Sequence, residues 1–291
     1  MDQAASLRNI VKQQNQKELT NARVIAVTSG KGGVGKSNTS INIALWYRRR
    51  GKRVVILDAD FGLANVEVMF GVIPKYNLSD VMFKGMDIKD IVSVGPEGVM
   101  FVSGGSGIAK LVNLDREQVR RLVSKMTELE ELADVVIIDT GAGISDSVME
   151  FLTATPELVL VTTPEPTSVT DSYSLLKALS MNPSFNNSVT KVMMLANRVS
   201  GEAEGKKLFE KLNAVVNRFL NITIEYAGCV PQDDCVSKAV MAQKPVSVLY
   251  PNSDAAKAYE RLVNTLENGW SEVQKPIGIR GFFRAVFSKK L

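Results

Sequence analysis

The chain has 291 residues, 45% of them hydrophobic, which is enough to bury one sizeable core. It contains no histidine, which excludes Ser-His-Asp triads, acid–base catalysis by imidazole and zinc sites with histidine ligands. The formal net charge is +4, but residues 275–291 hold five basic side chains and no acid, so the rest of the chain carries −1, which argues against a nucleic-acid-binding body.

The N-terminal segment predicts a short amphipathic helix. Residues 3–19 contain neither glycine nor proline, and Ala4, Leu7, Ile10 and Val11 recur at helical spacing. The segment is polar and lacks the apolar core of a signal peptide, and no run of about 18 apolar residues occurs anywhere in the chain. We therefore expect a cytoplasmic protein that does not span a membrane.

From Arg23 onward, short β-branched runs alternate with helix-compatible segments, which predicts an α/β fold. We expect a single doubly wound domain with a mainly parallel sheet and helices on both faces, of the P-loop NTPase type. The predicted strands have the sequences VIAVTSG, RVVILDAD, GVMFVSG, ADVVIIDT, ELVLVTT and KVMMLAN, with EYAGCVP as an edge strand. The predicted helices span 36–50, 115–131, 167–181, 204–219 and 253–274. No linker or repeat interrupts 21–274, so we expect one domain there, flanked by separate segments at 1–20 and 275–291.

A phosphate-binding motif follows the first predicted strand. Residues 29–37 have the sequence SGKGGVGKS, which satisfies G-x-x-x-x-G-K-[ST] between a strand and a helix. Backbone N–H groups of such a loop, together with the N-terminus of the next helix, stabilise bound phosphates. We expect Lys36 along the β- and γ-phosphates and the Ser37 hydroxyl on Mg²⁺. The residues predicted to bind the nucleotide here are Gly30, Lys31, Gly32, Gly33, Val34, Gly35, Lys36, Ser37 and Asn38.

The loop carries a second lysine, Lys31, and in this form it resembles the deviant Walker A motif of the MinD/ParA/nitrogenase-iron-protein class. The resemblance covers nearly the whole chain and implies a MinD-like ATPase that forms a face-to-face homodimer around ATP and Mg²⁺. It also implies that Lys31 contacts the partner subunit's nucleotide and stabilises charge on the transferring phosphoryl group. From the residues alone Lys31 is an exposed lysine in a glycine loop, so a solvated side chain is the alternative.

Three carboxylates lie at the carboxyl ends of predicted strands, where α/β proteins bind ligands. Asp58 and Asp60 resemble switch I of the family, which implies that Asp60 orients or deprotonates the attacking water and that Asp58 lies near the metal. Capping of the next helix is the alternative for both. Asp139 ends an apolar run as in a Walker B motif, and we expect it to hold Mg²⁺ through water; glycines after it suggest a mobile switch II. The predicted catalytic residues are Asp60, Lys31 and Lys36, and the predicted metal site is Ser37, Asp58 and Asp139.

Two further segments predict the base. The chain lacks the Asn-Lys-x-Asp motif that binds guanine, and Asn197 and Arg198 stand at the corresponding strand end. An asparagine amide matches the donor and acceptor of adenine. The turn Pro231-Gln232-Asp233 matches one that the family places near the base. We expect adenine, contacted by Asn197, Arg198, Pro231 and Asp233; helix capping is the alternative for Asn197 and Asp233.

The loop around Glu165 and the two cysteines receive no catalytic role. Prolines stiffen the loop at Pro164-Glu165-Pro166, which in relatives lies near the dimer interface, but the sequence assigns nothing to Glu165. Cys229 and Cys235 are too few for a structural zinc site and are not spaced as a redox pair. We interpret them as structural thiols in a reducing cytoplasm. They are also wrongly placed for the bridging pair of an iron–sulfur carrier.

The C-terminal segment predicts a cationic amphipathic helix. Its apolar residues fall at i, i+3, i+4, i+7 and i+8, namely Ile279, Phe282, Phe283, Val286 and Phe287. Such a helix suits a lipid interface, where basic side chains gain about 1 kcal/mol each near anionic headgroups. Docking of the same face on its own domain is the alternative. If monomers dock the helix and dimers release two copies, avidity would make membrane binding depend on the nucleotide.

The N-terminal segment carries a second resemblance. Residues 2–8, Asp-Gln-Ala-Ala-Ser-Leu-Arg, resemble the D-Q-A-x-x-L-R segment of the FlhG (YlxH) family, MinD-like regulators of bacterial flagellar number. The resemblance implies that this helix binds and stimulates FlhF, a signal-recognition-particle-type GTPase, with flagellar switch-complex (C-ring) proteins as further partners. A solvent-exposed helical cap is the alternative. The residues implied in partner binding are Asp2, Gln3, Ala4, Leu7 and Arg8.

These features favour a slow, dimer-dependent ATPase that regulates flagella from the inner face of the cell membrane. A MinD-type cell-division regulator is the first rival, and the N-terminal motif argues against it. A ParA-like DNA partition protein is the second, and the near-neutral body argues against it because such a protein needs a basic surface.

Overall fold

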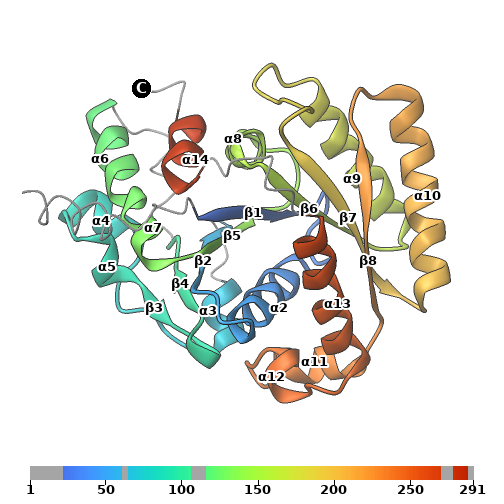
Figure 1. The fold of residues 1–291 in the computed structure, drawn as a ribbon, viewed down its shortest axis with the longest axis horizontal. Coiled ribbons are helices and arrows are strands. Elements are labelled where there is room, and N and C mark those ends of the chain that lie inside the picture. Colours follow the sequence, from blue (N-terminus) through green and yellow to red (C-terminus); the bar gives the residue numbers. More distant parts are fainter. Residues whose placement is uncertain (1–21, 61–64, 106–115, 270–277, 288–291) are drawn as a thin grey trace, which may run out of the picture.

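The computed structural model describes residues 22–60, 65–105, 116–269 and 278–287 (Figure 1). Within these residues eight strands form one sheet in the order β3-β4-β2-β5-β1-β6-β7-β8, and every neighbouring pair is parallel except β3 and β4. The predicted mainly parallel sheet is therefore confirmed, with β8 at one edge. The strands are β1 (Arg23–Thr28), β2 (Val54–Ala59), β3 (Ser93–Val94), β4 (Met100–Val102), β5 (Val135–Thr140), β6 (Glu157–Thr162), β7 (Lys191–Val199) and β8 (Ile224–Pro231).

Helices cover both faces of the sheet (Figure 1). On one face lie α2 (Lys36–Arg49), α3 (Asn65–Phe70), α11 (Asp234–Met241), α12 (Val246–Leu249) and α13 (Asp254–Asn268). On the other lie α4 (Leu78–Lys84), α5 (Ile88–Ile91), α6 (Arg116–Thr127), α7 (Leu129–Leu132), α8 (Asp146–Ala154), α9 (Pro166–Ser180), α10 (Glu202–Phe219) and α14 (Gly278–Val286). A short 3₁₀ turn spans Pro96–Gly98.

The central strands are buried on both sides, which explains their continuous apolar sequences. In β5, Val136 and Ile138 face one hydrophobic core and Val135 and Ile137 face the other. Alternate side chains of a strand point to opposite faces, so one apolar run supplies both cores.

Several element predictions need correction. The helix expected over 253–274 ends at Asn268, and Gly269, a residue favoured at helix ends, follows as its cap. The helix expected over 115–131 is divided into α6 and α7. The sequence pattern also missed α8, the short elements between β2 and β4, and α11 and α12. The helix predicted over 3–19, with its partner-binding residues, lies outside the described residues.

The C-terminal helix α14 packs on its own domain, as the docking alternative anticipates. Ile279, Phe282, Phe283, Val286 and Phe287 are only 0 to 7% exposed and belong to the core beneath α6 and α8. The ring centroid of Phe282 lies 5.8 Å from that of Phe151, a residue of α8. Arg280 and Arg284 remain exposed. Among the described helices, none has the length and hydropathy that crossing a bilayer requires.

Candidate functional site

The phosphate-binding loop joins β1 to α2 and is closely packed on two sides. A Cβ on Gly30 would lie 2.2 Å from the backbone carbon of Asp171 in α9, and one on Gly35 would lie 2.3 Å from Nδ2 of Asn197. Gly35 also has a φ of 96°, which other residues rarely adopt. Gly32 and Gly33, between them, face open space. The loop is therefore anchored at its ends and open in the middle, where a phosphate group would bind.

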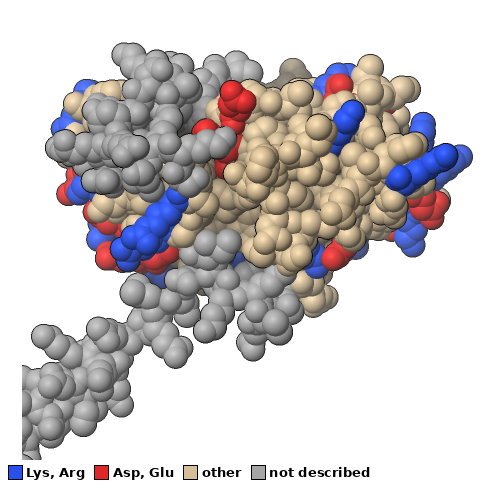
Figure 2. Space-filling model, turned by 90° about the horizontal axis from the view of Figure 1, so that it is seen from above, with Lys and Arg blue, Asp and Glu red and all other residues tan. Residues whose placement is uncertain are grey.

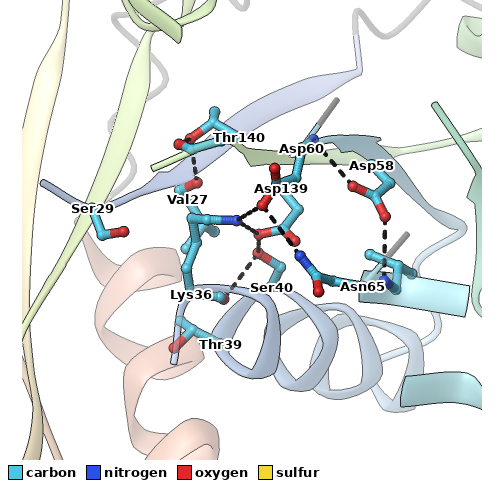
Figure 3. Close-up of polar contacts among 12 residues, drawn as sticks. Val27, Ser29, Lys36, Thr39, Ser40, Asp58, Asp60, Asn65, Asp139 and Thr140 are labelled. Atoms are coloured by element: carbon cyan, nitrogen blue, oxygen red, sulfur yellow. Dashed lines mark hydrogen bonds and ion pairs between the residues drawn. The ribbon is translucent and has the colours of Figure 1, made fainter. Parts of the chain in front are cut away.

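Lys36 lies between two of the predicted carboxylates (Figure 3). Its Nζ is 3.0 Å from Oδ1 of Asp139 and 3.7 Å from Oδ2 of Asp60, and its side chain is only 7% exposed. The strand order explains this arrangement, because β5 pairs with β1 on one side and with β2 on the other. The register places Asp139 beside Val27 of β1 and beside Asp58 of β2. The structure thus brings these side chains together at one edge of the sheet.

Asp58 and Asp60 differ in what they bind. Oδ1 of Asp58 accepts the N–H of Asp60 at 3.1 Å, and Oδ2 accepts the N–H of Val66 at 3.2 Å, so Asp58 does hold the start of α3. Burial, reinforced by the charge of Asp139, raises the pKa of Asp58 to about 7. Asp60 is 22% exposed and accepts a hydrogen bond from Nδ2 of Asn65. Its pKa is also raised by burial, although Lys36 opposes the shift.

Asp139 is fully buried, and only one of its two carboxylate oxygens has hydrogen-bond partners among the described residues. Its Oδ1 accepts hydrogen bonds from Lys36 and from the Ser40 hydroxyl, the latter at 2.8 Å, whereas Oδ2 has no partner among the described residues. The hydroxyl of the next residue, Thr140, lies within hydrogen-bonding distance of two carbonyls, at 2.9 Å from that of Gly141 and at 3.1 Å from that of Val27 in β1. Gly143 of the predicted switch II loop donates its N–H to the carbonyl of Ser29.

The oxygen atoms of this site suit magnesium better than a metal whose ligands all come from the protein. Magnesium takes oxygen ligands, usually one or two carboxylates with phosphate oxygens and water. The buried Oδ2 of Asp139 lacks a hydrogen-bond partner among the described residues, and Ser37 lies in the first turn of α2. The described parts of the chain contain no cluster of three or more His, Cys, Asp or Glu residues that would hold an ion alone. Ser37, Asp58 and Asp139 therefore fit a magnesium ion that is bound together with phosphates.

Lys31 is not simply solvated. Its Nζ donates to Oε2 of Glu165 at 2.8 Å and to the hydroxyl of Thr167 at 2.9 Å, both at the start of α9. The ion pair holds the pKa of Glu165 below its usual range. Because both side chains are more than a third exposed, solvent screens the pair and it adds little to the stability of the fold. Glu165 thus orders Lys31 but does not hold it strongly, a contact that the sequence did not predict.

A pocket of 280 Å³ beside the loop contains the residues predicted to contact the base. Asn197 donates from Nδ2 to the carbonyl of Val34 and accepts the N–H of Arg198, whose φ is 57°. Asp233 accepts the N–H groups of Cys235 and Ala255, so it caps α11 and connects it to α13. Burial alone would raise the pKa of Asp233, but these N–H donors hold it below its usual range. The pocket is lined by Gly35, Asn38, Asn197, Arg198, Pro231, Gln232, Asp233, Val236, Ser237 and Tyr259.

The two cysteines do not form a pair. Cys229 is buried, its thiol lies 3.1 Å from Oε2 of Glu202, and burial raises its pKa to about 11. Cys235 lies in the first turn of α11. Neither thiol is activated, which agrees with the structural role expected for them.

Comparisons with known proteins agree with this geometry. The sequence model of the ParA family, described as NUBPL iron-transfer P-loop NTPase, matches residues 20–267. The chain is 41% identical to the antiactivator FleN of Pseudomonas aeruginosa over 90% of this chain and 91% of that protein. It is 32% identical to the flagellum site-determining protein YlxH of Helicobacter pylori over 97% of each. Its fold resembles the septum site-determining protein MinD of Pyrococcus horikoshii, solved with Mg-ADP, with a TM-score of 0.65 and 23% identity over 89% of this chain and 98% of that one.

Replacing Asp233 by Ala tests the dual role of this carboxylate as a helix cap and a wall of the pocket. Losing the cap should lower the free energy of unfolding by about 1 kcal/mol, measured by urea denaturation. The displaced start of α11 should also weaken the binding of a fluorescent ATP analogue. Ser253→Ala is the control, because Ser253 caps α13 through its hydroxyl but does not line the pocket. Equal loss of nucleotide affinity in both variants would contradict a specific role of Asp233.

Proposed function

Since the chain belongs to the ParA/MinD family of P-loop NTPases, which are ATPases, we propose that it is a dimerising ATP switch that regulates the number and placement of bacterial flagella. The observation that carries the switch is the position of Lys36, which forms ion pairs with Asp139 and Asp60 where a triphosphate would need it. The flagellar role is supported by similarity to the flagellum site-determining protein YlxH over nearly the whole chain.

Nucleotide binding exchanges the partners of Lys36. The ammonium group is almost completely desolvated and is neutralised by carboxylates, so it leaves them only for a group of at least equal negative charge. The β- and γ-phosphates of ATP provide such a group, and the backbone N–H groups of the loop add to the attraction. Ser37, Asp58 and Asp139 would hold magnesium, which would neutralise part of the phosphate charge. Lys36 then moves away from Asp139, which remains buried with Ser40 as its donor.

Dimerisation exchanges the partners of Lys31. In the monomer Lys31 pairs with Glu165 and Thr167 of α9, and this exposed contact costs little to break. In a dimer formed around two nucleotides, Lys31 reaches the phosphates of the partner subunit and stabilises the charge that develops during transfer. The change from an internal to an intermolecular partner couples the assembly of the dimer to hydrolysis.

Asp60 directs the attacking water. It is the more exposed of the two switch I carboxylates, and Asn65 and Lys36 hold its orientation. Burial raises its pKa, which makes it a better acceptor for a proton or a hydrogen bond from water. Hydrolysis removes the γ-phosphate and dissolves the dimer, so the rate of this step sets the lifetime of the active state.

Two substitutions separate binding from hydrolysis. Lys36→Ala should abolish ATP binding, because the buried carboxylates then repel the phosphates without compensation, and the protein should stay monomeric. Asp60→Ala should still bind ATP and accumulate as a dimer that hydrolyses ATP at least about a hundredfold more slowly, the usual contribution of a positioned base. Light scattering after size-exclusion chromatography measures the oligomeric state of both variants with and without ATP. Asp134→Ala, which breaks an exposed ion pair with Arg53, is the control. A Lys36→Ala protein that still dimerises with ATP would contradict the scheme.

The docked helix α14 suggests how the nucleotide controls membrane binding. The helix packs against α8, and α8 begins at Asp146, directly after the glycine loop that follows Asp139. Movement of this loop when the γ-phosphate binds would shift α8 and weaken the contact between Phe151 and Phe282. The released helix presents an apolar face flanked by Arg280 and Arg284, which suits the anionic inner face of the cell membrane. Two copies in one dimer bind more strongly than one.

Liposome flotation tests this coupling. With vesicles that contain phosphatidylglycerol, the Asp60→Ala dimer with ATP should float, and the Lys36→Ala monomer should remain at the bottom of the gradient. Deletion of residues 275–291 should abolish flotation of the dimer. Equal membrane binding with and without this segment, or with and without ATP, would show that α14 is not the nucleotide-controlled anchor.

A partner interaction completes the proposal. We expect the segment 1–20, which lies outside the described residues, to bind and stimulate a signal-recognition-particle-type flagellar GTPase, FlhF, and the ATP-bound dimer to contact flagellar C-ring proteins. A second candidate follows from the relative named an antiactivator, in which case the switch would oppose an activator protein.

A pull-down with purified partners distinguishes these roles. Wild type should retain the GTPase, and a variant that lacks residues 1–20 should lose it while it still binds ATP. Retention of the GTPase by the truncated variant would contradict the assignment of this segment. Binding of a transcription activator in an ATP-dependent manner would instead favour the antiactivator role.

A further inference from the structure

The Ser40 side chain contacts the carboxylate of Asp139. It lies one turn after Lys36 on α2, is completely buried, and its hydroxyl is 2.8 Å from Oδ1 of Asp139 (Figure 3). The same hydroxyl lies 3.2 Å from the carbonyl of Lys36. A serine hydroxyl has a single proton to donate, and the shorter bond to a charged acceptor is the stronger one. Ser40 therefore donates to Asp139.

The two donors on Oδ1 of Asp139 behave differently in the ATP cycle. Lys36 must move to the phosphates, but Ser40 has a short side chain on a helix, and Oδ1 of Asp139 remains the nearer of its two acceptors. After the exchange, Ser40 is the one side chain among the described residues that still donates to Asp139. Without it, a completely buried carboxylate would have no fixed hydrogen bond and could rotate about its side-chain torsions.

The orientation of this carboxylate determines which oxygen is available to a metal. With Oδ1 bound by Ser40, Oδ2 is the buried oxygen that lacks a partner. We propose that Ser40 is a positioning residue, which fixes Asp139 so that Oδ2 faces the magnesium ion or its water shell and thereby sets how strongly magnesium tightens nucleotide binding. The inference rests on the proposed function, since it assumes that the loop binds MgATP.

A serine at this helical position needs such an explanation. Serine is a weaker helix former than alanine, and a hydroxyl in a core must find an acceptor. The other completely buried polar side chains nearby on α2, Thr39 and Asn42, also have acceptors, the backbone carbonyls of Gly35 and Asn38. The carboxylate of Asp139, brought to the face of α2 by β5, is the acceptor that stabilises the hydroxyl.

The experiment measures the affinity of a fluorescent N-methylanthraniloyl-ATP with excess Mg²⁺ and with EDTA, and takes the ratio of the two dissociation constants. In Ser40→Ala, the factor by which Mg²⁺ tightens nucleotide binding should be about ten- to a hundredfold smaller than in wild type, the usual effect of removing a partner that orients a metal ligand. Its affinity in EDTA should equal that of wild type. Ser40→Thr, which keeps the hydroxyl, should restore the ratio. Ser172→Ala, which removes another buried hydroxyl that bonds to Thr162, should leave it unchanged.

The outcomes separate this inference from the proposed function. If Ser40→Ala keeps the wild-type ratio of dissociation constants, Asp139 is oriented without Ser40. If Ser40→Ala binds the nucleotide equally more weakly with and without Mg²⁺, Ser40 supports the loop in general. Either result overturns the proposal. If Ser40→Ala does not fold, Ser40→Thr and Ser40→Val, which share a branched shape but differ in the hydroxyl, must differ in the ratio. Wild type that binds no nucleotide at all would instead overturn the proposed function.

Discussion

The ion pair between Lys36 and Asp139 is the interaction on which the rest of the site depends. A lysine and an aspartate that are both almost completely buried must neutralise each other, because an unpaired charge at this depth costs several kcal/mol. The pair keeps the site ordered without a ligand, and it also limits which ligand can enter. Only a group with negative charge and many acceptor oxygens can take Lys36 away from its carboxylates, which is the character of a nucleotide triphosphate bound with magnesium.

The order of strands makes this arrangement possible. Placing β5 between β2 and β1 brings Asp58, Asp139 and the start of α2 to one edge of the sheet, although they are far apart in the chain. Placing β6 beside β1 brings α9, with Glu165, next to Lys31. Helices α9 and α14 cover the same face of the sheet. Seen from above, the surface of the molecule includes a broad area without charged side chains (Figure 2). The Lys36–Asp139 ion pair and the Lys31–Glu165 contact thus lie around the loops that follow β1, β5 and β6.

The sequence predicted the loop, its lysines and the three carboxylates, because parallel strands end at a common edge and motif spacing reports which residues stand there. It did not predict the roles of Ser40 and Glu165, since those roles depend on which strands are neighbours, although Ser40 stands at helical spacing from Lys36 and was open to that inference.

For α14 the spacing of Phe282 and Phe283 identifies an apolar face but cannot say whether lipid or protein covers it; the structure shows protein. For Asp58 and Asp233, capping and ligand binding use the same carboxylate, and the structure shows both carboxylates accepting backbone N–H groups. Helix α8 was missed because its polar first turn follows the glycine loop without a strong apolar period.

The most direct test of the account is a crystal structure with Mg²⁺ and a non-hydrolysable ATP analogue. In that structure Nζ of Lys36 should lie within hydrogen-bonding distance of β- and γ-phosphate oxygens and should have left Asp139. Lys31 of each subunit should point towards the nucleotide of the other. A structure in which the nucleotide is bound but Lys36 keeps its ion pair with Asp139 would contradict the exchange of partners from which every later step follows.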